Sequence, residues 1–340
     1  MADDLIADAA AQVFARAATP EAVRAILAGG SPAALWDAVE ESGLLDGLVT
    51  EARGGAGLTL ADMLPVLLIS GRHAAPVPVG ETMLVRAALG GDAPRGRIAI
   101  AGRGAVQGRG VRCEQVTHGR DADWVLAALD GAWVLLPAEG GERRASPGGS
   151  AADADIDWPS RPGGLTAVSA ATDWRAAGAL VTAARMVGAM TRVLDDSVRY
   201  ASDRTQFGRP IGKFQAIQHQ LAVMAEQVEA AASAVRLGCV APPGPALVDP
   251  LRAAAAKLRA GQAAAAVSAI GHAVHGAIGV TAEFDLHLFT GLLQRGQLAF
   301  GGETYWAGVI GRAVLGDGDA GALDFVRRHL GTGESMGSNA

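Results

Sequence analysis

The sequence predicts a mainly α-helical fold with a small β module in its middle. Apolar residues recur at helical spacing from residue 3 to about residue 88, and the same periodicity returns from residue 174 onwards. Between them lie short apolar runs separated by glycine-containing breaks, which are typical of strands. At 340 residues the chain is also longer than one hydrophobic core usually serves. We therefore expect an N-terminal helical domain at 1–96, a shortened β domain at 97–168, a C-terminal four-helix bundle at 169–330 and a flexible tail at 331–340.

The N-terminal segment is predicted to form several short helices. Ser31 and Pro32 are typical of a helix start, because serine caps free N–H groups and proline tolerates the first turn. We therefore expect a helix from about Ala33. Glycines within 54–57 and prolines within 74–78 predict breaks between helices.

In the β module, apolar runs at 124–129 and 132–136 predict two strands. Asp130 and Gly131 lie between them, and this pair favours a two-residue turn with positive φ at both positions. The sequence thus predicts a hairpin. Residues 140–157 are rich in Gly, Ser, Asp and Ala, so we expect an exposed loop there.

The C-terminal half is predicted to be a bundle of long antiparallel helices. Prolines and glycine at 241–245 separate two of them. Each predicted helix is far longer than the average helix of a globular protein, and such helices pack as a bundle. The predicted helices cover 174–203, 214–237, 248–275 and 283–314.

Composition and charge exclude several classes of protein. A hydrophobic fraction of 50% with 19% charged residues excludes disorder along the whole chain. The net charge is −6 and no run of basic residues is longer than two, so nothing indicates nucleic-acid binding. DNA and RNA are therefore not expected as partners.

The few cysteines, the acidic N-terminus and the charged residues within the apolar stretches favour a soluble cytoplasmic protein. Cys113 and Cys239 are too few for a disulfide framework or a cysteine zinc site. The N-terminus is acidic and amphipathic, whereas a signal peptide would be basic and then uniformly apolar. The alanine-rich stretch 253–269 is interrupted by Lys257 and Arg259, so we expect no membrane span.

The most specific motif is the stretch 199–219, RYASDRTQFGRPIGKFQAIQH. Arg204 offers a planar fork of donors that suits a pyrophosphate, and Phe207 offers an apolar face for an adenine ring. Alternatively, Arg204 pairs with Asp203 or Asp196 on the surface and Phe207 fills the core at the helix end.

This stretch resembles the hallmark segment of flavin-dependent acyl-CoA dehydrogenases, and the order of helical, β and helical segments is similar to that family over nearly the whole chain. The resemblance implies an acyl-CoA dehydrogenase fold with FAD as the cofactor. In the family, the matching arginine and aromatic residue reach across a dimer interface to the FAD of the neighbouring subunit. The cofactor-binding residues that this stretch implies are Arg204, Gln206, Phe207, Phe214 and Gln215.

A second segment, HGAIGVTAE, resembles the family's glycine-rich turn, whose backbone amides approach FAD. It implies further contacts from Ala273, Gly276 and Ala277, although the family usually has glutamine at the first of these positions and glycine at the last. His272 and His275 share a helix face, but no acidic or cysteine ligand accompanies them. We therefore expect packing histidines and no metal site.

The position of the catalytic base departs from the family pattern. Desaturation of an acyl-CoA needs a carboxylate that takes the proton alpha to the thioester while hydride moves to the flavin. The two positions at which the family carries it match Phe300 and Gly178, and neither can accept a proton. Glu303 and Asp173 are nearby substitutes, and Glu303 is the candidate base. Alternatively, Glu303 is a surface carboxylate favoured by the dipole of the last helix.

The β domain lacks the family's threonine-glutamate-proline loop, its glycine-serine-aspartate turn and its tryptophan-containing strand, all of which hold the flavin ring. Two hypotheses follow. The chain is an acyl-CoA dehydrogenase subunit that desaturates a bulky, steroid-like or a fatty acyl-CoA, or it is a degenerate subunit that only completes a partner's FAD site. The resemblance implies an α2β2 hetero-oligomer, or otherwise a homo-oligomer, with electron-transfer flavoprotein as the electron acceptor.

Overall fold

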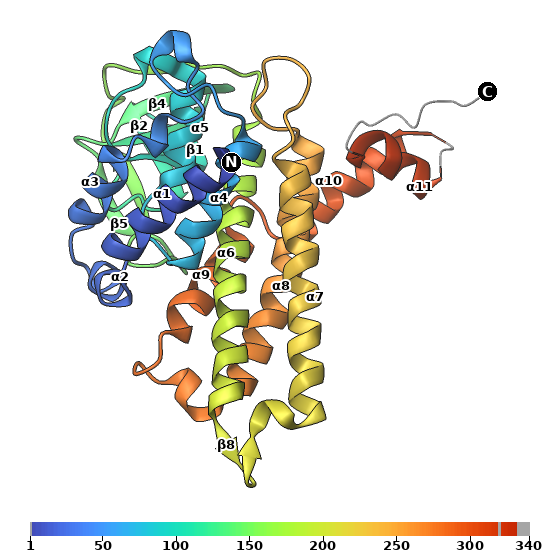
Figure 1. Ribbon diagram of the computed structural model, residues 1–340. Helices are drawn as coiled ribbons and strands as arrows, with labels where there is room; N and C mark the ends of the chain where they lie inside the picture. Colours follow the sequence, from blue (N-terminus) through green and yellow to red (C-terminus); the bar gives the residue numbers. More distant parts are fainter. Residues whose placement is uncertain (1, 319–320, 332–340) are drawn as a thin grey trace.

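The computed structural model describes residues 2–318 and 321–331, and it has the predicted mainly α fold with a small β module. Figure 1 shows the N-terminal helices and the sheet gathered at one end of the molecule, while three long helices of the C-terminal half extend away from them. The predicted tail at 331–340 lies, apart from Gly331, outside the described residues.

Two of the N-terminal helices begin with capping side chains, whereas the helix at Ala33 has Pro32 rather than the predicted Ser31 as its N-cap residue and no side-chain cap. Thr19 accepts a hydrogen bond from the Ala22 N–H (3.3 Å), and Thr59 and Asp62 cap each other's backbone in a capping box. The helix predicted from Ala33 begins there. The helices are α1 (Ala2–Ala17), α2 (Pro20–Leu27), α3 (Ala33–Glu41), α4 (Leu60–Arg72) and α5 (Val79–Leu89), with 3-10 turns at Leu44–Asp46, Glu51–Arg53 and Gly90–Asp92.

The middle of the chain forms one mixed sheet with the strand order β5-β6-β2-β1-β3-β4-β7. The β1–β3 pair is parallel, and the other pairs are antiparallel. The predicted hairpin is confirmed: β3 and β4 pair through a turn in which Asp130 has φ 51° and Gly131 has φ 80°. The strands are β1 (Ile98–Gln107), β2 (Gly110–Val116), β3 (Trp124–Leu129), β4 (Ala132–Pro137), β5 (Glu142–Ala145), β6 (Ala154–Trp158) and β7 (Thr166–Val168).

The expectation of an exposed loop at 140–157 is wrong, because β5 and most of β6 lie within it. Strand β5 is exposed along its whole length and has no apolar alternation, which explains the missing signal. Strand β6 carries Ile156, which is buried opposite Cys113 of β2. Pairing with β2, rather than local sequence preference, therefore orders this segment.

The two faces of the sheet belong to different cores. Ile98 and Ile100 of β1 and Leu126 of β3 pack into the main core with the helices. Ala99 and Val125, which alternate with them, pack into a second core on the other face. The sheet is therefore fixed against the helices on one side, and its edge loops can line a cavity between them.

The C-terminal half is a helical bundle in which α6 contacts α7, α8 and α9. The helices are α6 (Trp174–Asp203), α7 (Gln215–Gly238), α8 (Pro250–His275), α9 (Leu286–Leu298), α10 (Glu303–Gly316) and α11 (Ala322–Phe325). Shorter elements are the hairpin β8 (Thr205–Gln206) and β9 (Arg209–Pro210), 3-10 turns at Ile211–Lys213 and Gly276–Val280, and a π turn at Val326–Leu330.

One predicted helix is wrong: 283–314 is not continuous but is divided into α9 and α10. Phe300 (φ 58°) and Gly301 (φ 115°) lie in left-handed backbone conformations that an α-helix cannot contain. The helical periodicity on both sides hides this turn in the sequence. The turn directs the Phe300 side chain into the bundle, where it is 5% exposed.

Two helices, Trp174–Asp203 and Pro250–Val280, are long and apolar enough to cross a membrane by length and composition, so the expectation of no such segment is wrong. In the first, 83% of the apolar window is buried inside the protein, because α6 is the central helix of the fold. In the second, 39% of the window is buried, and its apolar character comes largely from alanine. Lys257 and Arg259 lie within this second helix, and it still meets the criterion of length and composition.

Helices α4 and α6 cross with their backbones in direct contact. A methyl group added at Gly71 would lie 1.9 Å from the Arg185 carbonyl oxygen, and one added at Gly188 would lie 1.8 Å from the Leu68 carbonyl oxygen. Only glycine permits such an approach. The crossing therefore fixes the middle of α6, including Arg185, against the N-terminal helices.

Candidate functional site

The hallmark residues lie at the end of the bundle that is farthest from the sheet (Figure 1). Phe207 occupies the turn of the β8–β9 hairpin with φ 51°, and its side chain is 92% exposed. Arg204 is exposed and has no ion pair within residues 2–318 and 321–331, while Asp196 pairs with Arg192 and Arg199. The alternative in which Arg204 pairs with Asp203 or Asp196 and Phe207 fills the core is therefore wrong.

The glycine-rich turn lies next to this hairpin. Ala201 and Val274 are buried together with Ile211 in a small core that joins the ends of α6 and α8. Because of this packing, Gly276, with φ 61° at the end of α8, lies on the same end of the bundle as Phe214. Ala273 and Ala277 are exposed there, as are Gln206 and Gln215.

The aromatic side chains at this end differ in their surroundings. Phe214 is partly buried, with the Phe207 ring 6.2 Å away edge-on and the Arg209 guanidinium 4.2 Å from its centroid. Phe207 itself has almost no cover from its own chain. A bare aromatic ring of this kind gains free energy when it is buried against another molecule.

These residues could form one half of a binding site for a dinucleotide such as FAD. They supply an exposed cation, an exposed aromatic ring and a backbone turn with glycine at positive φ. None of the eight implied cofactor residues lines either of the two main cavities of the described chain. A second surface is therefore needed to enclose the ligand.

The two histidines near this end are packed against protein groups. His275 is 3% exposed, its Nδ1 lies 2.8 Å from the Gly271 carbonyl oxygen, and its ring centroid lies 4.7 Å from that of Tyr200 with the two rings tilted. The His272 Nε2 lies 3.3 Å from the Thr290 hydroxyl. Within the described ranges, no group of three or more His, Cys, Asp or Glu residues could hold a metal ion.

The two family positions for the base converge in space although they are 122 positions apart in the sequence. A Cβ added at Gly178 would lie 2.6 Å from Cε1 of the Phe300 ring. The aromatic ring therefore fills the space above Gly178 at the centre of the bundle. A carboxylate side chain at position 178 would therefore collide with this ring.

The substitute carboxylates lie elsewhere. Glu303 is the first residue of α10 and is exposed, and it lines neither main cavity. Asp173 is the N-cap of α6, where its carboxylate accepts a hydrogen bond from the Ala176 N–H (3.0 Å). The role of Glu303 as a base stays a prediction.

Lys257 supports the turn that carries Phe300. Its side chain is 1% exposed, and Nζ donates to the carbonyl oxygens of Gln297 and Gly301, both at 3.0 Å. These carbonyls belong to the end of α9 and to the turn, so the ammonium group satisfies acceptors that the broken helix leaves free. Burial lowers the pKa of Lys257 from 10.5 to about 8, although the charge of Glu303 opposes this shift.

This pKa shift predicts a rise in stability with pH. Between pH 8 and 10.5 the unfolded chain binds a proton at Lys257 that the folded chain has lost, so the free energy of unfolding increases with pH. We expect the wild type to gain about 3 kcal/mol over Lys257→Met between pH 7 and pH 10.5. Urea denaturation at several pH values measures the difference. The only other lysine, Lys213, is exposed, so Lys213→Met should follow the wild type. Parallel curves for wild type and Lys257→Met would contradict the shift.

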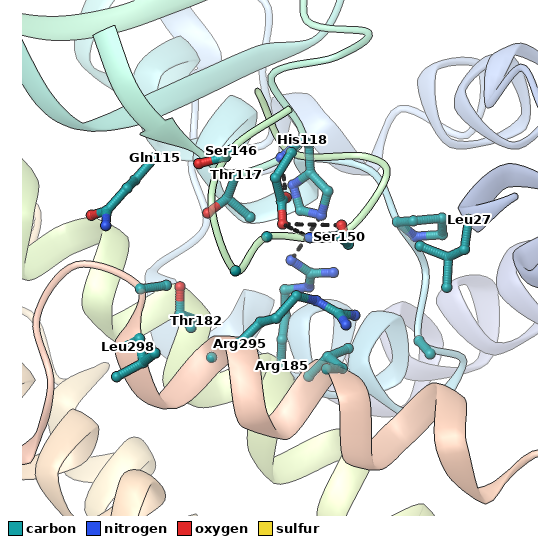
Figure 2. A pocket seen from close by; sticks show the side chains of 18 of the residues that line it. Leu27, Gln115, Thr117, His118, Ser146, Ser150, Thr182, Arg185, Arg295 and Leu298 are labelled. Carbon is teal, nitrogen blue, oxygen red and sulfur yellow. Dashed lines mark hydrogen bonds between the residues drawn. The ribbon is translucent and has the colours of Figure 1, made fainter. Parts of the chain in front are cut away.

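A cavity of about 140 Å³ lies between the sheet, α6 and α9 (Figure 2). Leu27 and Leu298 contribute apolar walls on opposite sides of it, and Thr182, which also lines it, lies one turn after Gly178. Ala299, the neighbour of Phe300, also lines it. The cavity is therefore adjacent to both family positions for the base.

Charged groups gather in the middle of this cavity, between Leu27 and Leu298 (Figure 2). Figure 2 shows Arg185 and Arg295 extending from two helices towards His118, which follows β2. Arg185 is 7% exposed; its Nη2 donates to the Ala75 carbonyl oxygen (2.7 Å), and its Nη1 lies 3.2 Å from His118 Nε2. Burial, together with the two arginines, lowers the pKa of His118 well below its usual range. The ring is therefore neutral and accepts from Arg185 at Nε2.

Sequence reasoning missed Arg185, His118 and Arg295. One signal was available for the first: Arg185 is the only charged residue between 176 and 191, in a stretch that the periodicity places at the centre of the bundle. A lone charge in such a position is expected to have a specific partner or a function. No comparable signal marks the other two, because their meeting depends on the packing of the sheet against α9.

Comparison with known proteins supports the resemblance. Residues 166–315 match the family described as acyl-CoA dehydrogenase, C-terminal domain. Over 299 residues the chain is 32% identical to "Acyl-CoA dehydrogenase IpdE2" of Mycobacterium tuberculosis, which covers 84% of this chain and 88% of that protein.

Solved structures share the fold. The ChsE4-ChsE5 complex from Mycobacterium tuberculosis matches with a TM-score of 0.77 and 24% identity over 95% of this chain and 98% of that chain. A variant of the "Tcur3481-Tcur3483 steroid ACAD" matches with a TM-score of 0.79 and 24% identity over 94% of this chain and 99% of that chain. The similarity thus extends over both the helical parts and the β module.

Proposed function

Because this chain belongs to the acyl-CoA dehydrogenase family, we propose that it is the subunit of a heteromeric FAD-dependent acyl-CoA dehydrogenase that lacks the catalytic base. A partner subunit with an intact flavin pocket and a carboxylate supplies the base. This chain supplies an exposed arm, which is the β8–β9 hairpin together with Arg204 and Phe207, and this arm completes the partner's FAD site. The assembly introduces a double bond between the alpha and beta carbons of an acyl-CoA thioester.

The observation that carries this proposal is the Phe300 ring packed on Gly178. Both family positions for the proton acceptor meet there, and an apolar ring occupies the space between them. Glu303 is exposed and lines neither cavity, and Asp153, which lines the cavity beside Phe300, is held by hydrogen bonds from the backbone of His118 and from Ser150. The exposed arm at the other end of the bundle is unaffected by this loss.

The chemistry divides between the two subunits. The partner's carboxylate takes the alpha proton, and bound FAD supplies the acceptor for the beta hydrogen as hydride. In this chain, Arg204 offers its guanidinium to the pyrophosphate and Phe207 covers an apolar ring face. Phe214 and Arg209 hold the hairpin that carries them. Electron-transfer flavoprotein would be the electron acceptor of the assembly, and the assembly would act in the cytoplasm.

The names of the relatives support a bulky acyl group. One solved neighbour is called a steroid ACAD, and another is a complex of two named chains, ChsE4 and ChsE5. We therefore propose an α2β2 assembly acting on a steroid-like acyl-CoA. The second candidate function is a self-sufficient enzyme in which Glu303 is the base, and the family membership of the chain supports this alternative.

The visible spectrum of the purified protein tests the proposal. We expect the chain expressed alone to retain little flavin, and the complex formed by co-expression with the products of neighbouring genes to show a flavin spectrum and acyl-CoA turnover. In that complex, Glu303→Gln should leave turnover within about twofold of wild type, because it removes only an exposed carboxylate. A fully flavinylated, active homo-oligomer that Glu303→Gln inactivates would establish the second candidate instead.

A further inference from the structure

The cavity beside Phe300 carries more positive than negative charge. Arg185 and Arg295 both line it, and no carboxylate oxygen lies within 4 Å of either guanidinium group in the described chain. Burial and the proximity of Arg185 lower the pKa of Arg295, although the charge of Asp153 opposes this. Two neighbouring guanidinium groups in an apolar surrounding are stabilised when an anion lies between them.

Asp153 is the carboxylate that lines this cavity, and its oxygens are already occupied. One oxygen accepts a hydrogen bond from the backbone N–H of His118 (2.9 Å). The other accepts hydrogen bonds from the backbone N–H (2.7 Å) and the hydroxyl (3.0 Å) of Ser150. Asp153 thereby fixes the loop 146–153 over the cavity and is not free to pair with both arginines. Its single charge also leaves one arginine uncompensated.

Glu81 does not change this balance. It is 1% exposed and does not line the cavity, and neither carboxylate oxygen has a hydrogen-bond partner in the described chain. Burial raises the pKa of Glu81, although the charge of Arg185 opposes this. Burial without a hydrogen-bond partner favours the neutral form of this carboxyl group. His118 is neutral, so it adds no charge to that of the two arginines.

We propose that these charged groups of the cavity bind a carboxylate carried by an acyl group at a position distal to its thioester. The planar guanidinium groups of Arg185 and Arg295 match the two oxygens of a carboxylate. The apolar walls near Leu27, Leu288 and Leu298 cover the hydrocarbon part of the same ligand. The inference rests on the proposed function only in naming a CoA thioester as the carrier of the carboxylate.

A matched pair of thioesters tests the inference. Adipoyl-CoA and hexanoyl-CoA have the same chain length, and only the first carries a distal carboxylate. We expect calorimetric titration of the full chain to show at least tenfold tighter binding of adipoyl-CoA, since a charge-assisted bidentate contact contributes that much. Arg295→Met should reduce the preference to less than threefold, and Arg295→Lys should keep part of it. Arg312→Met, which removes an exposed arginine outside the cavity, should keep the full preference.

Free hexanoate separates this inference from the proposed function. Because its own carboxylate is free, hexanoate should raise the melting temperature of the wild type and of Arg312→Met more than that of Arg295→Met. If neither thioester binds but hexanoate shows this pattern, the carboxylate site stands and the proposed function fails. Equal binding of the two thioesters, or a preference that Arg295→Met leaves intact, would overturn the inference while the proposed function stands. Arg295 is partly exposed, so its replacement is not expected to prevent folding.

Discussion

Gly188→Ala is expected to destabilise the protein by about 3 kcal/mol or more, although alanine favours helices more than glycine does. The added Cβ would lie 1.8 Å from the Leu68 carbonyl oxygen, and that oxygen belongs to the backbone of α4 and cannot move alone. The two helices must separate, and the close packing of the core between them is lost. Urea denaturation followed by circular dichroism measures the effect.

Gly311→Ala is the matched control. Gly311 also lies within a helix, but a Cβ added there meets nothing within 4 Å. The same substitution should therefore stabilise the protein by about 0.5–1 kcal/mol through helix propensity alone. If both variants had equal stability, the contact between α4 and α6 would be refuted. Because the crossing positions Arg185, any folded Gly188→Ala protein should also lose part of the carboxylate preference.

Arg204→Ala is expected to weaken flavin retention in the assembled oligomer about tenfold to a hundredfold. The substitution removes a charge-assisted contact with the pyrophosphate, which contributes about 1.5–3 kcal/mol. Arg204 has no ion pair within the described residues, so its loss should leave the stability of the chain unchanged. Flavin released during gel filtration, measured by absorbance, gives the comparison. Arg236→Ala, at the other end of α7, is the control.

Phe207→Ala extends the same test to the apolar contact. Its ring is 92% exposed, so truncation should not change the free energy of unfolding of the chain alone. Flavin retention in the oligomer should nevertheless fall, because the ring would be buried against the ligand or the partner. Unchanged retention in both Arg204→Ala and Phe207→Ala, at unchanged stability, would refute the role of the arm.

The sequence was informative about elements whose formation depends on neighbouring residues. The bounds of α6 match the predicted helix at 174–203, and the hairpin at Asp130-Gly131 has the predicted positive φ angles. These features follow from periodicity, capping and turn preferences, which act over a few residues. The hallmark stretch likewise indicated the family before any contact was known, because its residues are contiguous.

The tertiary structure decided the features that depend on residues distant in the sequence. The turn between α9 and α10 is stabilised by Phe300 packing on Gly178 and by Lys257 holding the free carbonyls, and the pair Gly301-Gly302 is a local signal that the helical periodicity on both sides outweighed. Strand β5 has no apolar pattern and is ordered by pairing with β6.

The candidate site shows the same division. Its exposed arm was predictable from one motif, and Arg185 alone carried a signal, as a lone charge in an apolar helix. The meeting of Arg185 with His118 and Arg295, at sequence separations of 67 and more than 100 residues, results from the packing of the sheet against two helices. Sequence periodicity determines the face that each helix or strand buries. The pairing of these buried faces is determined only when the helices and strands pack against one another.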